Sequence, residues 1–258
     1  MEVSLQTYFS RAMIMAEFEL RKLWHDQTQV WIRIIQPALW LLVFGEAFTK
    51  LKAIPTGNYT YLQFMTPGVL AQSVLFVAIF YGINVVWERD LGILNKLLST
   101  PSPRSSIVIG KALAAGARGI FQAVAIVILA LIIQVHLLFN PLYLLLVLII
   151  VVLFGACFAS LSMCLAAFFR TRDRVMGIGQ ALTMPLFFAS NAIYPTSILP
   201  TWLKAVVIIN PLSYVVDALR GLLVTNDLSK LPLDMLVIVF ATVLMVILAS
   251  WNFKRIIS

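Results

Sequence analysis

The sequence predicts an all-α integral membrane protein with six transmembrane helices, and two observations carry that prediction. Of the 258 residues, 61% are hydrophobic and only 12% are charged, whereas soluble domains carry about 25% charged residues. The apolar residues also gather in runs of roughly 20 or more, the length that crosses a hydrocarbon core. The predicted spans cover residues 30–49, 64–87, 106–135, 141–169, 175–193 and 233–252. We expect residues 1–258 to form a single transmembrane domain.

Six spans place both termini on one side of the membrane, and most basic residues fall on that side. By the positive-inside rule, which places Lys and Arg in cytoplasmic loops, we expect both termini to be cytoplasmic. No cleavable signal peptide is expected, because Met1 to Asp26 contains acidic residues and lacks an uninterrupted apolar core.

The first 29 residues are too polar to span the membrane and too apolar to stay in water. Apolar and charged residues mix there at helical spacing, which predicts an amphipathic helix in the cytoplasmic interface. Whether this helix also braces a cytosolic partner stays open. In the span that follows, Pro37 predicts a kink, because proline removes one backbone hydrogen bond.

Polar side chains inside the spans are candidate contacts for a transported substrate. They are Gln36, Gln72, Tyr81, Asn84, Gln122, Gln180 and Asn191. Arg118 is the most interior cation of the predicted spans, about two turns into the third. We expect its side chain to reach back to the cytoplasmic face, in preference to lining a substrate path.

Between the second and third spans, residues 88–104 combine charges, prolines and four leucines. Leu91, Leu94, Leu97 and Leu98 recur at helical spacing, which predicts a short helix beginning at about Asp90 and ending before Pro101. Ser105 or Ser106 is expected to cap the next helix. A helix this short is marginal in water. It therefore lies on lipid headgroups or is held by a soluble partner.

Residues 193–224 interrupt the pattern of spans, since four prolines divide residues 184–224 and Trp202 to Ile209 is too short to cross. Asn210 and Pro211 predict the start of a helix, with Asn at the cap and Pro at the first position. Asp217 and Arg220 lie three residues apart and can pair on one face. We expect an outer re-entrant helical hairpin; a surface helix is the alternative.

The sequence offers no residues for a chemical reaction. Gly110 and Lys111 resemble the end of a phosphate-binding loop, but the required Gly five residues earlier is missing. Cys157 and Cys164 lie two helical turns apart, too far for a disulfide. His25 and His136 fall on opposite sides of the membrane. We therefore expect no catalytic site, metal site, cofactor or nucleic-acid partner, and an energy source outside this chain.

Two stretches resemble the permease subunits of type-2 ABC exporters, in the branch of drug-resistance and nodulation-factor permeases. They are ERDLGILNKLLSTPSPRSSIVIGK at 88–111 and INPLSYVVDALRG at 209–221. The resemblance implies that the first stretch contains a coupling helix that contacts an ATPase. Its implied coupling residues are Glu88, Arg89, Asp90, Gly92, Leu94, Leu97, Leu98 and Pro101. The second stretch resembles the outer signature of the family, with Asn210, Pro211, Tyr214, Asp217 and Arg220 matching.

The resemblance also implies partners. A permease of this kind works with two cytosolic ABC ATPase subunits, which bind ATP and Mg, and with a second permease copy or a close relative. It resides in a bacterial or archaeal cell membrane, in contact with lipid. Its cargo is an amphiphilic drug, a lipid or a lipid-linked glycan moved outward. A non-transport membrane scaffold or sensor is the alternative, and co-purification of an ATPase separates the two.

Overall fold

The computed structural model describes residues 5–25, 28–52, 54–99, 103–169 and 171–257, and every regular element in these ranges is helical. The predicted all-α class is therefore confirmed. The elements are α1 (Leu5–His25), α2 (Thr28–Leu39), η1 (Trp40–Gly45), α3 (Glu46–Leu51), α4 (Tyr61–Asp90), α5 (Ile93–Leu98), α6 (Arg104–Ile132), α7 (Pro141–Ala166), α8 (Arg172–Phe188), η2 (Thr196–Ile198), α9 (Thr201–Ile209), α10 (Pro211–Arg220), η3 (Gly221–Thr225) and α11 (Leu231–Ile257).

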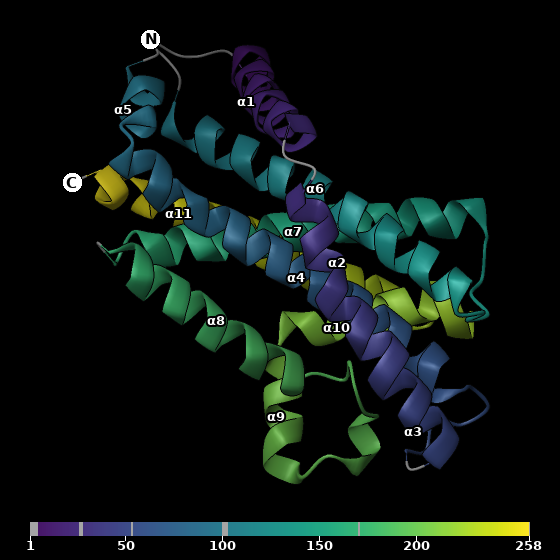
Figure 1. Ribbon diagram of the computed structural model, residues 1–258. Helices are drawn as coiled ribbons and strands as arrows, with labels where there is room; N and C mark the ends of the chain where they lie inside the picture. The colour runs from purple at the N-terminus through teal and green to yellow at the C-terminus, as the bar shows by residue number, and fades with distance from the viewer. Residues whose placement is uncertain (1–4, 26–27, 53, 100–102, 170, 258) are drawn as a thin grey trace.

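The long helices run side by side as a bundle with two distinct ends (Figure 1). One end, here named the α5 end, carries α5 and the connection from α7 to α8. The other, here named the α3 end, carries α3 and the connections from α6 to α7 and from η3 to α11.

Five segments are long and apolar enough to cross a membrane: Ile32–Leu51, Tyr61–Asp90, Arg104–Ile132, Pro141–Ala166 and Leu231–Phe253. They correspond to five of the six predicted spans. The fifth predicted span, 175–193, corresponds to α8, which ends at Phe188 after 17 residues and so is shorter than these five segments. At 1.5 Å per residue it is about 25 Å long, shorter than a hydrocarbon core of about 30 Å. By length and composition, α9 and the α10–η3 segment, bent by 83°, also qualify together as one broken crossing or as a re-entrant loop.

The first span is continuous but irregular after Pro37. α2 passes into the wider π-helical turn η1 at Trp40 and then into α3. Since proline has no N–H, the carbonyl of Arg33, four residues earlier, loses its helical partner. The Gln122 side chain of α6 donates to this carbonyl oxygen at 3.3 Å. α2 nevertheless continues through Pro37 to Leu39, and α6 supplies the missing hydrogen bond; the expected kink stays a prediction.

Small residues let the central helices approach closely. A Cβ atom on Gly116 of α6 would meet the backbone of Val152 in α7, and one on Gly155 would lie 2.8 Å from the Cα of Gly116. Likewise, a Cβ atom on Gly82 of α4 would lie 2.5 Å from the carbonyl oxygen of Ala159 in α7. Close backbone contact of this kind is a main source of helix association in lipid.

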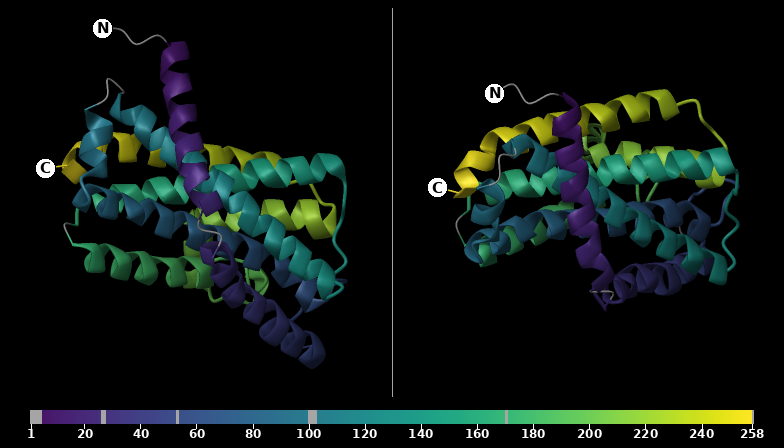
Figure 2. Two further views of the ribbon diagram at one scale, coloured as in Figure 1. Left: turned by 45° about the horizontal axis from the view of Figure 1, so that its top comes forward. Right: turned by 90° about the horizontal axis from the view of Figure 1, so that it is seen from above.

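The amphipathic helix expected in residues 1–29 is α1, and it crosses the bundle over α6 near the α5 end (Figure 2). Its buried face includes Ala12, Met15 and Ala16, while Phe18 is exposed. A Cβ atom on Gly110 of α6 would lie 2.7 Å from the Ala12 carbonyl oxygen. The helix thus packs on protein as well as offering an apolar face to its surroundings.

The expected hairpin in residues 193–224 places α10 inside the bundle, because Leu212, Val216 and Leu219 are all fully buried. This excludes the alternative of a surface helix. As predicted, Asn210 caps α10, accepting from the Leu212 N–H at 3.0 Å, and Pro211 takes the first position. The Asn210 amide also donates to the carbonyl oxygens of Leu186 and Ala189, at 2.7 and 2.8 Å, and so joins α10 to the end of α8.

Candidate functional site

The predicted coupling helix begins later than expected. α4 continues to Asp90, so Glu88, Arg89 and Asp90 form its last turn, and α5 starts only at Ile93. Between them Gly92 has φ of +71°, a left-handed conformation that glycine adopts without strain. Because a residue in this conformation ends a helix, the predicted start at Asp90 is wrong by three residues.

The leucines of this stretch do not form one docking face. Leu94 is fully buried in the core and Leu97 is half-buried, whereas Leu91 is 67% exposed. The outward surface of α5 also includes Asn95 and Lys96. Leu94 is therefore corrected from a partner contact to an anchor of α5 on its own bundle. Pro101 and the side chain of Leu98 lie outside the described residues.

Glu88 belongs to a buried ion cluster that joins three helices. The Lys111 ammonium of α6 donates to Glu88 of α4 at 2.6 Å and to Glu19 of α1 at 2.8 Å. The three side chains are only 4% (Lys111), 11% (Glu88) and 2% (Glu19) exposed. A partner protein cannot reach Glu88 in this arrangement. Its position fixes α1 and α6 to the end of α4, immediately before the turn into α5.

Arg118 extends the same cluster, because its side chain reaches α1. Its guanidinium donates to the Glu19 backbone carbonyl at 2.8 Å and lies 4.0 Å from the Glu19 carboxylate. It also lies over the ring of Tyr81, 4.2 Å from the centroid. A cation over an aromatic face in a desolvated place is a favourable contact. Tyr81, a candidate substrate contact, is thus part of this cluster.

A second, more exposed network links α4 to α8 at the same end. Arg172 donates to Asp90 at 2.7 Å, and its guanidinium lies 5.5 Å from the centre of the Trp87 ring. Arg89 contacts the other oxygen of Asp90 at 3.1 Å. The charges of the last turn of α4 therefore hold the neighbouring helices in place, and α5 projects from that fixed base.

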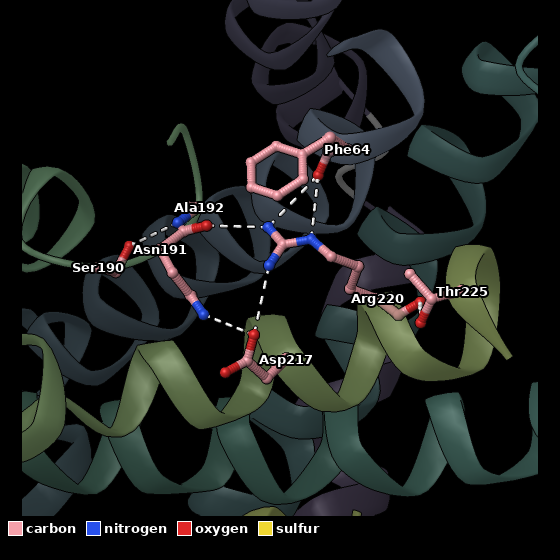
Figure 3. Close-up of polar contacts among 7 residues, drawn as sticks. All are labelled: Phe64, Ser190, Asn191, Ala192, Asp217, Arg220 and Thr225. Atoms are coloured by element: carbon pink, nitrogen blue, oxygen red, sulfur yellow. Dashed lines mark hydrogen bonds and ion pairs between the residues drawn. The ribbon is translucent and has the colours of Figure 1, made fainter. Parts of the chain in front are cut away.

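At the α3 end, Arg220 is the centre of the predicted outer signature (Figure 3). It contacts Asp217 at 3.3 Å, as the sequence predicted, and donates to the Asn191 carbonyl at 2.8 Å and the Phe64 carbonyl at 3.4 Å. Its guanidinium lies 3.8 Å from the Phe64 ring centroid. The Asn191 amide donates to Asp217 at 2.6 Å. One arginine thus joins α10, α4 and the segment after α8.

Tyr214, also in the signature, donates to the Ile208 carbonyl at 2.8 Å and braces the turn from α9.

The candidate substrate contacts do not converge in this chain. Gln36, Asn84 and Gln180 are exposed on three different helices. Gln122 supports the backbone at Pro37, and Asn191 belongs to the Arg220 network. Gln72 is buried in α4, and both polar atoms of its amide are without a hydrogen-bond partner among the described residues. An unsatisfied amide at this depth is costly.

Sequence reasoning missed the role of Glu19 and of the Phe64 carbonyl. Phe64 contributes a backbone atom, which no side-chain pattern reveals. Glu19 could have been suspected, because it lies three residues after Ala16 and four after Met15 and so continues the apolar stripe of α1.

The family model for the ABC-2 type transporter matches residues 11–224. The chain is 29% identical to the putative transport permease ycf38 of Cyanophora paradoxa, over 73% of this chain and 66% of that protein. It is 25% identical to the daunorubicin resistance ABC transporter permease protein DrrB1 of Streptomyces coeruleorubidus, over 77% of this chain and 70% of that protein. It is 24% identical to the inner membrane transport permease YadH of Escherichia coli K12, over 86% of this chain and 89% of that protein. Together with the helical bundle and the two predicted sequence stretches, the family match over most of its length places this chain in the ABC-2 type transporter family.

Proposed function

We propose that the chain is the permease subunit of an ATP-driven exporter, with the α5 end in the cytoplasm and both termini on that side. The single observation that carries the proposal is α5 itself, a six-residue helix at the tip of the longest helix of the bundle. Leu94 anchors it inward, while Leu91 and Lys96 face outward. An isolated helix of this length is unstable in water, so its fixed position suits a contact surface for another protein.

The proposed partners are two cytosolic ABC ATPase subunits, which bind ATP and Mg and supply the energy. A force applied to α5 reaches α4 through one glycine turn. From the last turn of α4 it passes to α1 and α6 through Glu88 and Lys111, and to α8 through Asp90 and Arg172. This connectivity supports a role for α5 in transmitting the ATPase cycle to the membrane helices.

Leu91→Asp tests this proposal, with Leu51→Asp as the matched control. Leu91 is 67% exposed at the α5 end and Leu51 is 70% exposed on α3 at the other end. Neither change removes a buried contact, so both variants are expected to fold. We expect Leu91→Asp to abolish co-purification of an ATPase and Leu51→Asp to retain it. If both variants retain the ATPase equally, α5 is not its docking site. If the wild-type permease captures none, the alternative of a non-transport scaffold or sensor is favoured.

We further propose a second permease copy beside the first span. The α2–η1 segment exposes Ile35, Leu39 and Leu42 together, and TM helices associate through such faces by close packing. The cargo that fits a pathway between two apolar bundles is an amphiphile, such as a drug, a lipid or a lipid-linked glycan. Stimulation of the ATPase activity of the assembled complex by such compounds identifies the class.

A further inference from the structure

We propose that a cavity at the α3 end binds a small cationic amine, through Asp234 together with Asp217 and Asp227. The cavity has a volume of about 120 Å³ and lies between α10, η3 and the first turn of α11. It is distinct from the α5 surface, and its proposed ligand does not depend on the transport function. The binding of the amine can therefore fail or succeed without deciding whether the chain exports anything.

With all three carboxylates ionised, the charges that line the cavity sum to one negative charge in excess. Arg220 contacts Asp217 at 3.3 Å, so these two charges offset each other. Lys230 is the other cation of the cavity wall, facing the two carboxylates of Asp227 and Asp234. Asp227 accepts from the Ser229 N–H at 3.0 Å, and hydrogen bonds from Ser229 hold the pKa of Asp227 below its ordinary value. A single positive charge in the cavity restores neutrality.

Asp234 is the observation that points to a ligand. It is only 3% exposed, and it lines the cavity. Among the described residues, no hydrogen bond or ion pair reaches its carboxylate; its backbone N–H alone is bonded, to the Lys230 carbonyl. Burial disfavours the charged form of a carboxyl group, and a cation or hydrogen-bond donor beside it favours that form. The N-terminus of α11 stabilises it in part, and a donor placed in the cavity supplies what is missing.

The shape of the cluster favours an ammonium group over a bare metal ion. Within the described ranges, no three His, Cys, Asp or Glu side chains are placed to hold one metal ion. An ammonium group needs only hydrogen-bond acceptors on separate walls, and it donates up to three N–H bonds. A volume of about 120 Å³ is well above the roughly 10–15 Å³ that one water needs on the same measure, so the cavity has room for several waters or for one short alkylammonium group. Such a group occurs on free amines and on the headgroup of phosphatidylethanolamine.

The first experiment measures binding to the purified full-length permease in detergent. Thermal unfolding is followed by tryptophan fluorescence during titration with ethanolamine hydrochloride, with sodium chloride and tetramethylammonium chloride as controls for ionic strength and for a cation without N–H donors. We expect a saturable rise of the unfolding temperature with ethanolamine alone. In Asp234→Asn the midpoint concentration should rise at least about tenfold, while Asp173→Asn, an exposed aspartate of α8, should match wild type.

Native mass spectrometry of permease released from nanodiscs distinguishes the two possible sources of the ammonium group, a free amine and a phosphatidylethanolamine headgroup. Retention of phosphatidylethanolamine over phosphatidylcholine, lost in Asp234→Asn, assigns the site to a lipid headgroup. Ethanolamine binding without lipid retention assigns it to a free amine. Equal responses to all three salts, or an unchanged response in Asp234→Asn, overturn the proposal. If Asp234→Asn does not fold without amine, the carboxylate is structural and Asp227→Asn, at the exposed rim, must then weaken amine binding for the proposal to stand.

Discussion

Replacing Lys111 with Met gives the sharpest test of the buried ion cluster at the α5 end. Methionine fills a similar volume but removes the ammonium that Glu19 and Glu88 share at 2.8 and 2.6 Å. Two carboxylates that are almost without solvent then lose the cation between them, and the Arg118 guanidinium, 4.0 Å from Glu19, is farther away than the ammonium was. We expect α1 to loosen first, because Glu19 is the one member of the cluster that α1 contributes.

The size of the effect follows from burial. At an effective dielectric constant of about 20, each contact near 2.7 Å corresponds to roughly 6 kcal/mol of attraction before desolvation is subtracted. Removing one partner from a buried ion pair costs about 3–5 kcal/mol in the free energy of unfolding. The exposed pair Arg21–Glu17 on α1, with side chains 77% and 62% exposed, is the control. Loss of this pair in Arg21→Ala should lower the free energy of unfolding by no more than about 1 kcal/mol.

The measurement is reversible unfolding in mixed detergent micelles, titrated with a denaturing detergent and followed by tryptophan fluorescence. Limited proteolysis of α1 gives a second readout. The reasoning is refuted if Lys111→Met unfolds within about 1 kcal/mol of wild type, no worse than Arg21→Ala. In that case water reaches the cluster and its short contacts contribute little.

Two further predictions concern the α3 end and the second permease copy. Arg220→Lys keeps the charge but loses the planar fork that reaches three acceptors, so we expect a loss of unfolding free energy of about 1.5–3 kcal/mol; a loss no larger than that of Asp217→Asn would show that the backbone contacts are unimportant. In a background lacking Cys157 and Cys164, single cysteines at the exposed Ile35 or Leu39 should form cross-linked dimers, whereas one at the fully buried Leu41 should not; equal cross-linking at all three positions contradicts an ordered interface.

Local chemistry made parts of this structure predictable. The spans follow from hydropathy, and the start of α10 follows from an Asn–Pro pair whose cap is a local hydrogen bond. The Asp217–Arg220 contact also follows from three-residue spacing on a helix. The spans depend on one continuous stretch of sequence, and the cap and the ion pair depend on residues within one turn of each other, which is why the sequence alone was sufficient.

The errors came from local caps and from contacts between distant segments. Ser105 or Ser106 was expected to cap α6, but Pro103 occupies the cap position and the Ser106 hydroxyl donates to its carbonyl at 2.7 Å. Nothing in the neighbourhood of Arg118 reveals that α1 covers it. Glu88 was assigned to a partner contact for the same reason. A charge in a membrane protein is readily assigned to water or to a partner when its internal counter-ion lies 92 residues away, as Glu19 does from Lys111.

The close approach of Gly82 to α7 gives α4 the geometry of a lever with unequal arms. The contact with the Ala159 carbonyl is a natural fulcrum. From there the helix extends six residues, about 9 Å, to Glu88, and fourteen residues, about 21 Å, to Gly68, which lies against Ala192. A shift of 1 Å imposed at the short arm therefore becomes about 2 Å at the long arm. If it were passed from Ala192 to the neighbouring Asn191, a displacement of about 2 Å would take the 2.8 Å contact between Arg220 and the Asn191 carbonyl beyond hydrogen-bonding distance.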